Sequence, residues 1–319
     1  MKSNLKELMK KPEISAFLFL IILCVGISFG SGIFLTSANM INILRQISRI
    51  AILAVAMAFT IISGGIDLSI GRLVGMSAII GAFLISESGL GLPPAVGLAG
   101  MVLAGSACGL VNGLLITRLG IPPFIATLGM SNVSYGIALM ISRGMPIRVE
   151  KTWITFFGGG KLGNIPFSIL IMLLIILLGF FISKYTVYGR NIYITGNSEK
   201  AAKLSGINVK TTRIIPYVMN GLLAAIVGLI LLGQMSTADA GYGDGNELDA
   251  IAAAVIGGIS MSGGEGNIGG IIVGAAIMGV LNNAFTLLRV PAYWQTFCLG
   301  IVIICSVALD CARKLKADR

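Results

Sequence analysis

The stretch IAILAVAMAFTIISGGIDLSIG, residues 50–71, decides the fold class. Its first part is an unbroken apolar run of the kind that enters a hydrocarbon core as a helix. The run then meets two serines, three glycines and the carboxylate of Asp67 within nine residues. Glycine weakens a helix interior, and a carboxylate at membrane depth is costly. The stretch therefore predicts a membrane helix that breaks at Ser63.

The composition extends this prediction to the whole chain. Hydrophobic residues make up 56% of the 319 positions, charged residues only 11%, and the mean hydropathy is +0.95. A soluble chain carries roughly 25% charged residues. Glycine occurs 43 times, and small residues let membrane helices approach closely. We expect an all-α, polytopic membrane protein with tightly packed helices.

Several function classes are disfavoured by what the sequence contains. The chain has no histidine, so no histidine-based triad, metal ligand or proton relay is expected. Five cysteines show no metal-ligand spacing and are interpreted as packing residues, so no metal site is expected: Cys24, Cys108, Cys298, Cys305 and Cys311. We predict that the chain is not an enzyme. Its net charge of +10 suggests the positive-inside bias of membrane proteins rather than nucleic-acid binding.

About ten membrane spans are predicted, within a single transmembrane domain over residues 1–319. The spans are 14–35, 50–63, 73–86, 93–116, 121–142, 166–184, 214–235, 248–262, 268–288 and 291–309. Residues 36–49 are amphipathic, and they form either an interfacial helix or the entry into the second span. With both termini inside, sixteen Lys and Arg residues lie inside and seven outside, which is the expected bias.

This topology places four hydrophilic segments. Residues 1–13 form a cytoplasmic N-terminal segment, 186–213 a cytoplasmic loop, and 310–319 a cytoplasmic tail. Residues 143–165 form a periplasmic loop that carries Trp153, Phe156 and Phe157. These aromatic side chains belong either to an interfacial belt or to an exposed ledge for a binding protein.

Two segments resemble each other and suggest an internal repeat. SGGIDLSIG begins at Ser63, and SGGEGNIGG begins at Ser262. Each follows an apolar run, and each places a carboxylate, Asp67 or Glu265, shortly after the glycines. Internal repeats recur in transporters. The match is also compatible with chance between glycine-rich helices.

The two breaks are hinge or gate candidates. The residues concerned are Gly64, Gly65, Asp67, Ser69, Gly263, Gly264 and Glu265. In one interpretation the carboxylates are buried and paired with a cation such as Arg72. In the favoured alternative, Asp67 and Ser69 cap the next helix at the inner interface, where water removes the cost of the charge.

The longest hydrophilic stretch between spans, residues 184–213, predicts a short helix. Ser198 or Asn197 can cap its start, Glu199 suits its positive end, and Gly206 can end it. A capped helix projecting from a membrane domain would suit docking of a soluble partner, although a merely solvated loop fits equally.

Four stretches together resemble a known family. They are residues 63–71, 122–130, 188–209 and 246–270, in sequence SGGIDLSIG, PPFIATLGM, YGRNIYITGNSEKAAKLSGINV and NELDAIAAAVIGGISMSGGEGNIGG. Glu199, Ala201, Ala202 and Gly206 are similar to the loop by which ABC importer permeases dock on their ATPase. The set resembles the ribose, xylose and galactose branch of those permeases, most closely its ribose-type members. Asp244 is an extra acidic residue beside the fourth stretch.

The resemblance implies the partners and the place of action. It implies two permease subunits, either two copies of this chain or this chain and a paralogue, in a bacterial inner membrane. ATPase subunits beneath them would bind ATP and Mg²⁺, and a periplasmic protein would deliver a monosaccharide. The chain itself lacks the GxxxxGK[ST] loop that cradles phosphates.

Two questions stay open. Thr127, Ser131, Asn132, Asn282 and Asn283 are substrate-path candidates suited to a polyol, but the same groups commonly form hydrogen bonds between helices. The alternative function is an ion-coupled secondary transporter that uses Asp67 and Glu265. No feature of the sequence identifies one sugar.

Overall fold

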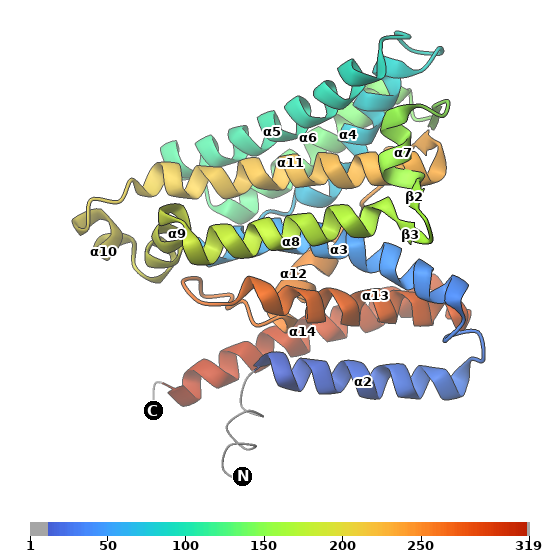
Figure 1. Ribbon diagram of the computed structural model, residues 1–319. Helices are drawn as coiled ribbons and strands as arrows, with labels where there is room; N and C mark the ends of the chain where they lie inside the picture. The colour runs from blue at the N-terminus through green and yellow to red at the C-terminus, as the bar shows by residue number, and fades with distance from the viewer. Residues whose placement is uncertain (1–11, 318–319) are drawn as a thin grey trace.

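Long apolar helices follow one another along the chain and pack side by side in a bundle (Figure 1). The computed structural model describes residues 12–317. The larger helices are α2 (Pro12–Gly30), α3 (Ser37–Ile62), α4 (Ile70–Ile85), α5 (Pro94–Arg118), α6 (Pro123–Ser142), α8 (Phe167–Tyr185), α11 (Val209–Met235), α13 (Ile271–Leu287) and α14 (Ala292–Ala317). Shorter helices are α7 (Trp153–Gly159), α9 (Val187–Asn197), α10 (Glu199–Leu204), α12 (Asn246–Ile256) and the 3₁₀ turn η1 (Ile268–Gly270).

The helices confirm a multi-pass, nearly all-α fold. Among the described residues, six helical stretches are long and apolar enough to cross a membrane: α3, α5, α6, α8, α11 and Ile268–Leu287. Helices α2, α4 and α14 contain shorter apolar stretches. The predicted N-terminal segment 1–13 lies almost wholly outside the described residues, as does the end of the tail 310–319.

The bundle has two distinct ends (Figure 1). One, here called the α10 end, carries α9 and α10, and both ends of the described chain lie toward it. The other, the α7 end, carries α7 and two small ribbons, which the sequence did not predict. Strand β1 (Ile147–Arg148) pairs with β4 (Thr237–Ala238), and β2 (Lys161–Leu162) pairs with β3 (Ile165–Pro166).

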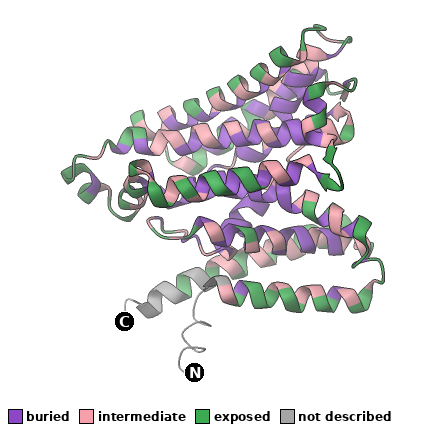
Figure 2. Cartoon of the chain, viewed as in Figure 1, coloured by how far each residue is buried: buried purple, intermediate pink, exposed green. Residues whose placement is uncertain are grey.

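Residues 36–49 form no separate interfacial helix. Helix α3 runs unbroken from Ser37 to Ile62, and the Thr36 side chain accepts a hydrogen bond from the Asn39 amide at its start. The second alternative, an entry into the span, is therefore the correct one. Every residue of α3 from Ile50 onward is buried, which makes this helix the centre of the core (Figure 2).

Two of the predicted spans are helices too short to cross by themselves. Helix α4 has 16 residues and α12 has 11, whereas a span needs ~20. Residues 63–69 precede α4 and residues 239–245 precede α12, and neither segment is helical. The start of α4 lies against the second segment, because Gly71 and Gly75 pack on the carbonyls of Gly243 and Ala240. The predicted span 73–86 coincides with α4 up to Ile85, whereas the prediction of a continuous span over 248–262 was wrong, because α12 ends at Ile256, just before Gly257 and Gly258.

Glycine spacing explains how tightly α5 and α11 pack. Gly105, Gly109 and Gly113 lie four residues apart, so they share one face of α5. A Cβ added at Gly105 would meet the Gly221 carbonyl of α11, and one at Gly109 would meet the Tyr217 carbonyl. The two backbones approach this closely only because side chains are absent, as is typical of small-residue membrane interfaces.

Candidate functional site

The predicted short helix exists as α10, and its two ends have the predicted geometry. The Ser198 hydroxyl accepts a hydrogen bond from the Ala201 amide at 3.2 Å. At the other end Gly206 has a φ of +75°, its amide bonds the Lys203 carbonyl, and the Ile207 amide bonds the Ala202 carbonyl at 3.0 Å. This pair of bonds is a Schellman motif, in which glycine avoids the strain of the left-handed region.

Glu199 makes two ion pairs, one within α10 and one that fixes α10 to the bundle. Its carboxylate lies 2.7 Å from the Lys203 ammonium, one turn along α10, and 2.8 Å from the Arg213 guanidinium of α11. The hydrogen bond from Lys203, followed by the positive charge of Arg213, lowers the pKa of Glu199. The ion pairs are therefore complete above the ordinary pKa of a glutamate and are lost as the pH falls through the lowered value.

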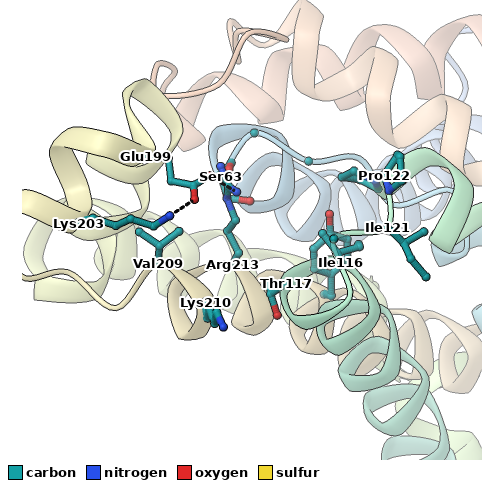
Figure 3. A pocket seen from close by; sticks show the side chains of 15 residues that line it. Ser63, Ile116, Thr117, Ile121, Pro122, Glu199, Lys203, Val209, Lys210 and Arg213 are labelled. Carbon is teal, nitrogen blue, oxygen red and sulfur yellow. Dashed lines mark hydrogen bonds and ion pairs between the residues drawn. The ribbon is translucent and has the colours of Figure 1, made fainter.

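Arg213 joins α10 to the first glycine break. Its Nε donates to the Ser63 carbonyl at 3.3 Å, while its Nη1 holds Glu199 (Figure 3). Ser63 ends α3, and Gly64 follows it with a φ of +84°. The predicted docking helix and the predicted hinge are thus one assembly, joined by an arginine that the sequence analysis did not single out.

The second glycine break lies against the first. The Gly264 amide donates to the Ile62 carbonyl at 2.9 Å, and a Cβ at Gly263 would lie 3.3 Å from the Gly64 Cα. Helix α9 closes over both breaks, because Gly196 packs on the Ile62 carbonyl and the Gly264 amide. The two similar segments therefore meet at the α10 end.

A cavity of about 440 Å³ opens between α10, the end of α3 and the turn from α5 to α6 (Figure 3). Its walls include Ser63, Thr117, Pro122, Glu199 and Arg213. Glu199 and Arg213 are partly exposed, so the cavity is reached from the α10 end. We call this assembly, with α10 and both glycine breaks, the α10-end site.

Asp67 is buried, and water does not compensate its charge as the favoured interpretation required. Asp67 is 0% exposed to solvent. One carboxylate oxygen accepts from the amide and hydroxyl of Ser69, and the other accepts from the Asn220 side chain of α11 at 2.9 Å. Ser69 stands at the start of α4 but makes no capping bond with its own side chain. Asp67 instead ties the break to α11.

The pairing of the carboxylates with Arg72 was also wrong. Arg72 lies 2.8 Å from Asp244, in the non-helical segment before α12, and its guanidinium stacks on the Tyr135 ring. Glu265 is exposed rather than buried. The two carboxylates of the repeat therefore have different surroundings, which weakens the case for a shared ion site.

The polar substrate-path candidates are dispersed. Thr127 is buried and donates to Pro123 within α6, and Asn132 is exposed and donates to Leu128 in the same helix. Asn283 exchanges hydrogen bonds with Asn39 across α13 and α3 at 2.8 and 3.0 Å. Asn282 bonds Asp249, and Ser131 is half-buried.

The residues that the sequence analysis missed are those that join elements far apart in the chain. Asn220 bonds both Asp67 and Thr60, and Asn112 of α5 bonds the Ser69 hydroxyl. Their separations of 153 and 43 residues leave no local pattern to detect. The available signal was chemical: an asparagine within an apolar helix requires a partner.

Comparison with known proteins gives consistent relatives. The chain is 38% identical to the ribose import permease protein RbsC of Escherichia coli (strain K12), with 93% of each chain covered. It is 31% identical to the xylose transport system permease protein XylH of Haemophilus influenzae, covering 97% of this chain and 99% of that one. It is 33% identical to the fructose import permease protein FrcC of Rhizobium meliloti, covering 92% and 83%. No solved structure matches the chain significantly.

One family description covers most of the sequence. Residues 39–307 match the family described as "Branched-chain amino acid transport system / permease component". The matched range includes both glycine breaks, α10 and the α5–α11 contact. With that coverage and relatives above 30% identity, the chain belongs to this family of transport-system permeases.

Proposed function

We propose that this chain is the membrane-spanning permease subunit of an ATP-driven importer that carries a monosaccharide across the bacterial inner membrane. The observation that carries the proposal is α10 itself. Leu204, at the end of α10, is 89% exposed and lies outside the long apolar helices. Other residues of α10, Glu199 and Lys203, line the 440 Å³ cavity, and Glu199 is ion-paired to Arg213 of the bundle. A strongly exposed leucine on a short, rigidly capped helix is suited to a partner's groove.

The nature of the cargo comes from the relatives. The family description mentions branched-chain amino acids, whereas the relatives are named for ribose, xylose and fructose. Their similarity extends over nearly the whole chain, so the sugar class is the better assignment. Among sugars, a pentose such as ribose is favoured by the higher identity of the ribose permeases.

The proposed assembly has this chain at its centre. Two permease subunits, two copies or this chain and a paralogue, span the membrane in about ten helices each, with both termini in the cytoplasm. ATPase subunits that bind ATP and Mg²⁺ lie against the α10 end, and a sugar-binding protein docks at the α7 end. There Trp153 and Phe156 are half-exposed on α7, which supports a landing surface.

The mechanism of coupling follows from the α10-end site. Movement of an ATPase against Leu204 shifts α10, and the shift passes through Glu199 and Arg213 to the Ser63 carbonyl. Gly64 and Gly264 have positive φ and no side chain, so the chain can pivot where α3 ends. Residues 63–69 connect this pivot to α4, so α4 moves with respect to α11.

Reconstitution tests the proposal. The chain, its ATPase and its binding protein in proteoliposomes should accumulate radiolabelled D-ribose, D-xylose or D-fructose only when ATP is enclosed on the ATPase side. An uncoupler should leave this import unchanged. Import without ATP that collapses with the uncoupler would support the ion-coupled alternative and contradict the proposal.

Substitutions at Asp67 separate a positioning role from ion coupling. Asp67→Asn should retain at least half of ATP-driven uptake, because Asn220 can turn its amide and offer its unpaired oxygen. Asp67→Leu should destabilise the protein by about 2–4 kcal/mol, because the Ser69 amide and the Asn220 amide lose their acceptor in a buried site. Uptake and thermal stability in detergent measure both. Loss of uptake in a stable Asp67→Asn protein would indicate that the carboxylate carries an ion.

A further inference from the structure

A small polar cavity lies in the middle of the bundle, away from the α10-end site. It measures about 80 Å³ and is lined by Gln46, Arg49 and Ile50 of α3, Asn246 and Asp249 of α12, and Asn282 of α13. Arg49 lies halfway along α3, so the cavity is at mid-height of the helix at the centre of the core. Asn246 and Asp249 belong to the first turn of α12, where the non-helical segment 239–245 ends.

Most of these side chains have unused hydrogen-bonding capacity. The Asn282 amide donates to Asp249 at 3.2 Å. In the part of the chain that the structure describes, the side chains of Gln46, Arg49 and Asn246 make no hydrogen bond. An arginine and an amide at this depth cost several kcal/mol unless they meet a partner or a water-filled space. The cavity is therefore built for a polar occupant rather than for lipid.

The charges indicate what kind of occupant fits. Arg49 and Asp249 face the same cavity with opposite charges, so their sum favours neither an anion nor a cation. Three amides, a guanidinium and a carboxylate supply both donors and acceptors, and Ile50 adds an apolar wall. A sugar presents the same mixture, with hydroxyls that donate and accept and with apolar C–H faces. Polar groups converging on a partly apolar cavity are typical of small-molecule sites.

The neighbouring surface is polar as well. Arg72, paired with Asp244 and stacked on Tyr135, lies on the helix beside the segment that leads into α12. The starts of α4 and α12 thus flank a non-helical stretch inside the bundle. Interrupted helices that line a cavity are a recurrent way to bind substrate near the membrane midplane.

We propose that Gln46, Arg49, Asn246, Asp249 and Asn282 form a subsite that hydrogen-bonds the hydroxyl edge of a neutral sugar during passage. The proposal rests on the proposed function and assigns the place where the cargo is held. A cavity of about 80 Å³ accommodates one edge of a sugar ring, so the remainder of the sugar faces the open side. Of the residues predicted from the sequence, only Asn282 belongs to this subsite.

Substituted cysteines test the subsite directly. In a chain whose five native cysteines are replaced by alanine or serine, Gln46→Cys should react with a charged, water-soluble thiol reagent. Addition of 100 mM D-ribose, D-xylose or D-fructose should slow this reaction at least threefold. Leu44→Cys is the matched control, because Leu44 lies two residues away on α3 and is an exposed apolar residue. It should react slowly, with no change on addition of sugar.

Transport variants provide the second readout. Asp249→Asn and Asn282→Ala should lower the sugar imported per ATP hydrolysed at least fivefold, while the complex still assembles and hydrolyses ATP. Thr286→Val, one turn further along α13, should leave this ratio unchanged. Failure of the unmodified complex to import any of the three sugars with ATP would contradict the proposed function. If the unmodified complex does import a sugar, two results would overturn the subsite alone. One is a Gln46→Cys variant that does not react with the reagent, or whose reaction sugar does not slow. The other is an unchanged ratio of imported sugar to hydrolysed ATP in both transport variants.

Discussion

Glu199→Lys is expected to abolish ATP-driven sugar uptake and to release the ATPase subunits from the membrane. In the protein, the Glu199 carboxylate lies between Lys203 at 2.7 Å and Arg213 at 2.8 Å. A lysine there would place three positive charges together and would remove the carboxylate from the positive end of α10. Arg213 would lose its partner, and the connection from α10 to the Ser63 carbonyl would loosen. Co-purification of the ATPase and uptake in proteoliposomes measure the two effects.

Two further variants of α10 sharpen this expectation. Leu204→Asp should weaken ATPase association at least tenfold without loss of thermal stability, because Leu204 is exposed in the isolated chain. Gly206→Trp should also abolish uptake, because a bulky side chain is strained at a φ of +75° and the backbone at the end of α10 must therefore change. Thr296→Ala, on an exposed position of α14 outside the α10-end site, is the control and should transport normally. Normal uptake by both Glu199→Lys and Gly206→Trp would contradict the docking role of α10.

Gly221→Val is expected to separate α5 from α11 and to prevent accumulation of folded protein. The first side-chain atom at Gly221 would already overlap the Gly105 carbonyl, which belongs to backbone and cannot rotate away. Overpacking a fixed core costs typically 1–3 kcal/mol. Here the cost should be at the upper end or above it, because the whole contact between two long helices must shift. Folded yield and the midpoint of thermal unfolding in detergent measure the effect.

A control of the same type isolates packing from helix propensity. Gly136 lies within α6 with no atom within 4 Å of an added Cβ. Gly136→Ala should raise the midpoint or leave it unchanged, because alanine favours a helix over glycine. Gly221→Ala should lower it. Equal midpoints for the two alanine variants would show that α5 and α11 are not held by close backbone contact.

Sequence reasoning predicted the local features well because their causes are local. The start of α10 at Ser198 and its end at Gly206 depend on side chains within three residues of the helix ends. The breaks after Ser63 and Ser262 depend on adjacent glycines. The helix bounds of α5, α6 and α8 lie within a few residues of the predicted spans for the same reason.

The surroundings of individual polar residues could not be predicted in this way. Asp67 and Glu265 occupy similar positions in similar segments, yet one is buried beside Asn220 and the other is exposed. Similarly, Asn282 lines a cavity while the next residue, Asn283, bonds Asn39. Neighbouring residues on a helix point about 100° apart, so the packing of the bundle decides what each one meets.

The sequence by itself determined that this chain is a multi-pass helical membrane protein of a transporter type, with a capped helix and two glycine breaks. Hydropathy, helix caps and backbone freedom are properties of residues and their immediate neighbours, so they can be seen in the sequence. Only the tertiary structure decided that Arg213 joins α10 to the first break, and that Arg49, Asp249 and Asn282 share one cavity. Those contacts depend on the order and rotation of packed helices, which no short stretch of sequence specifies.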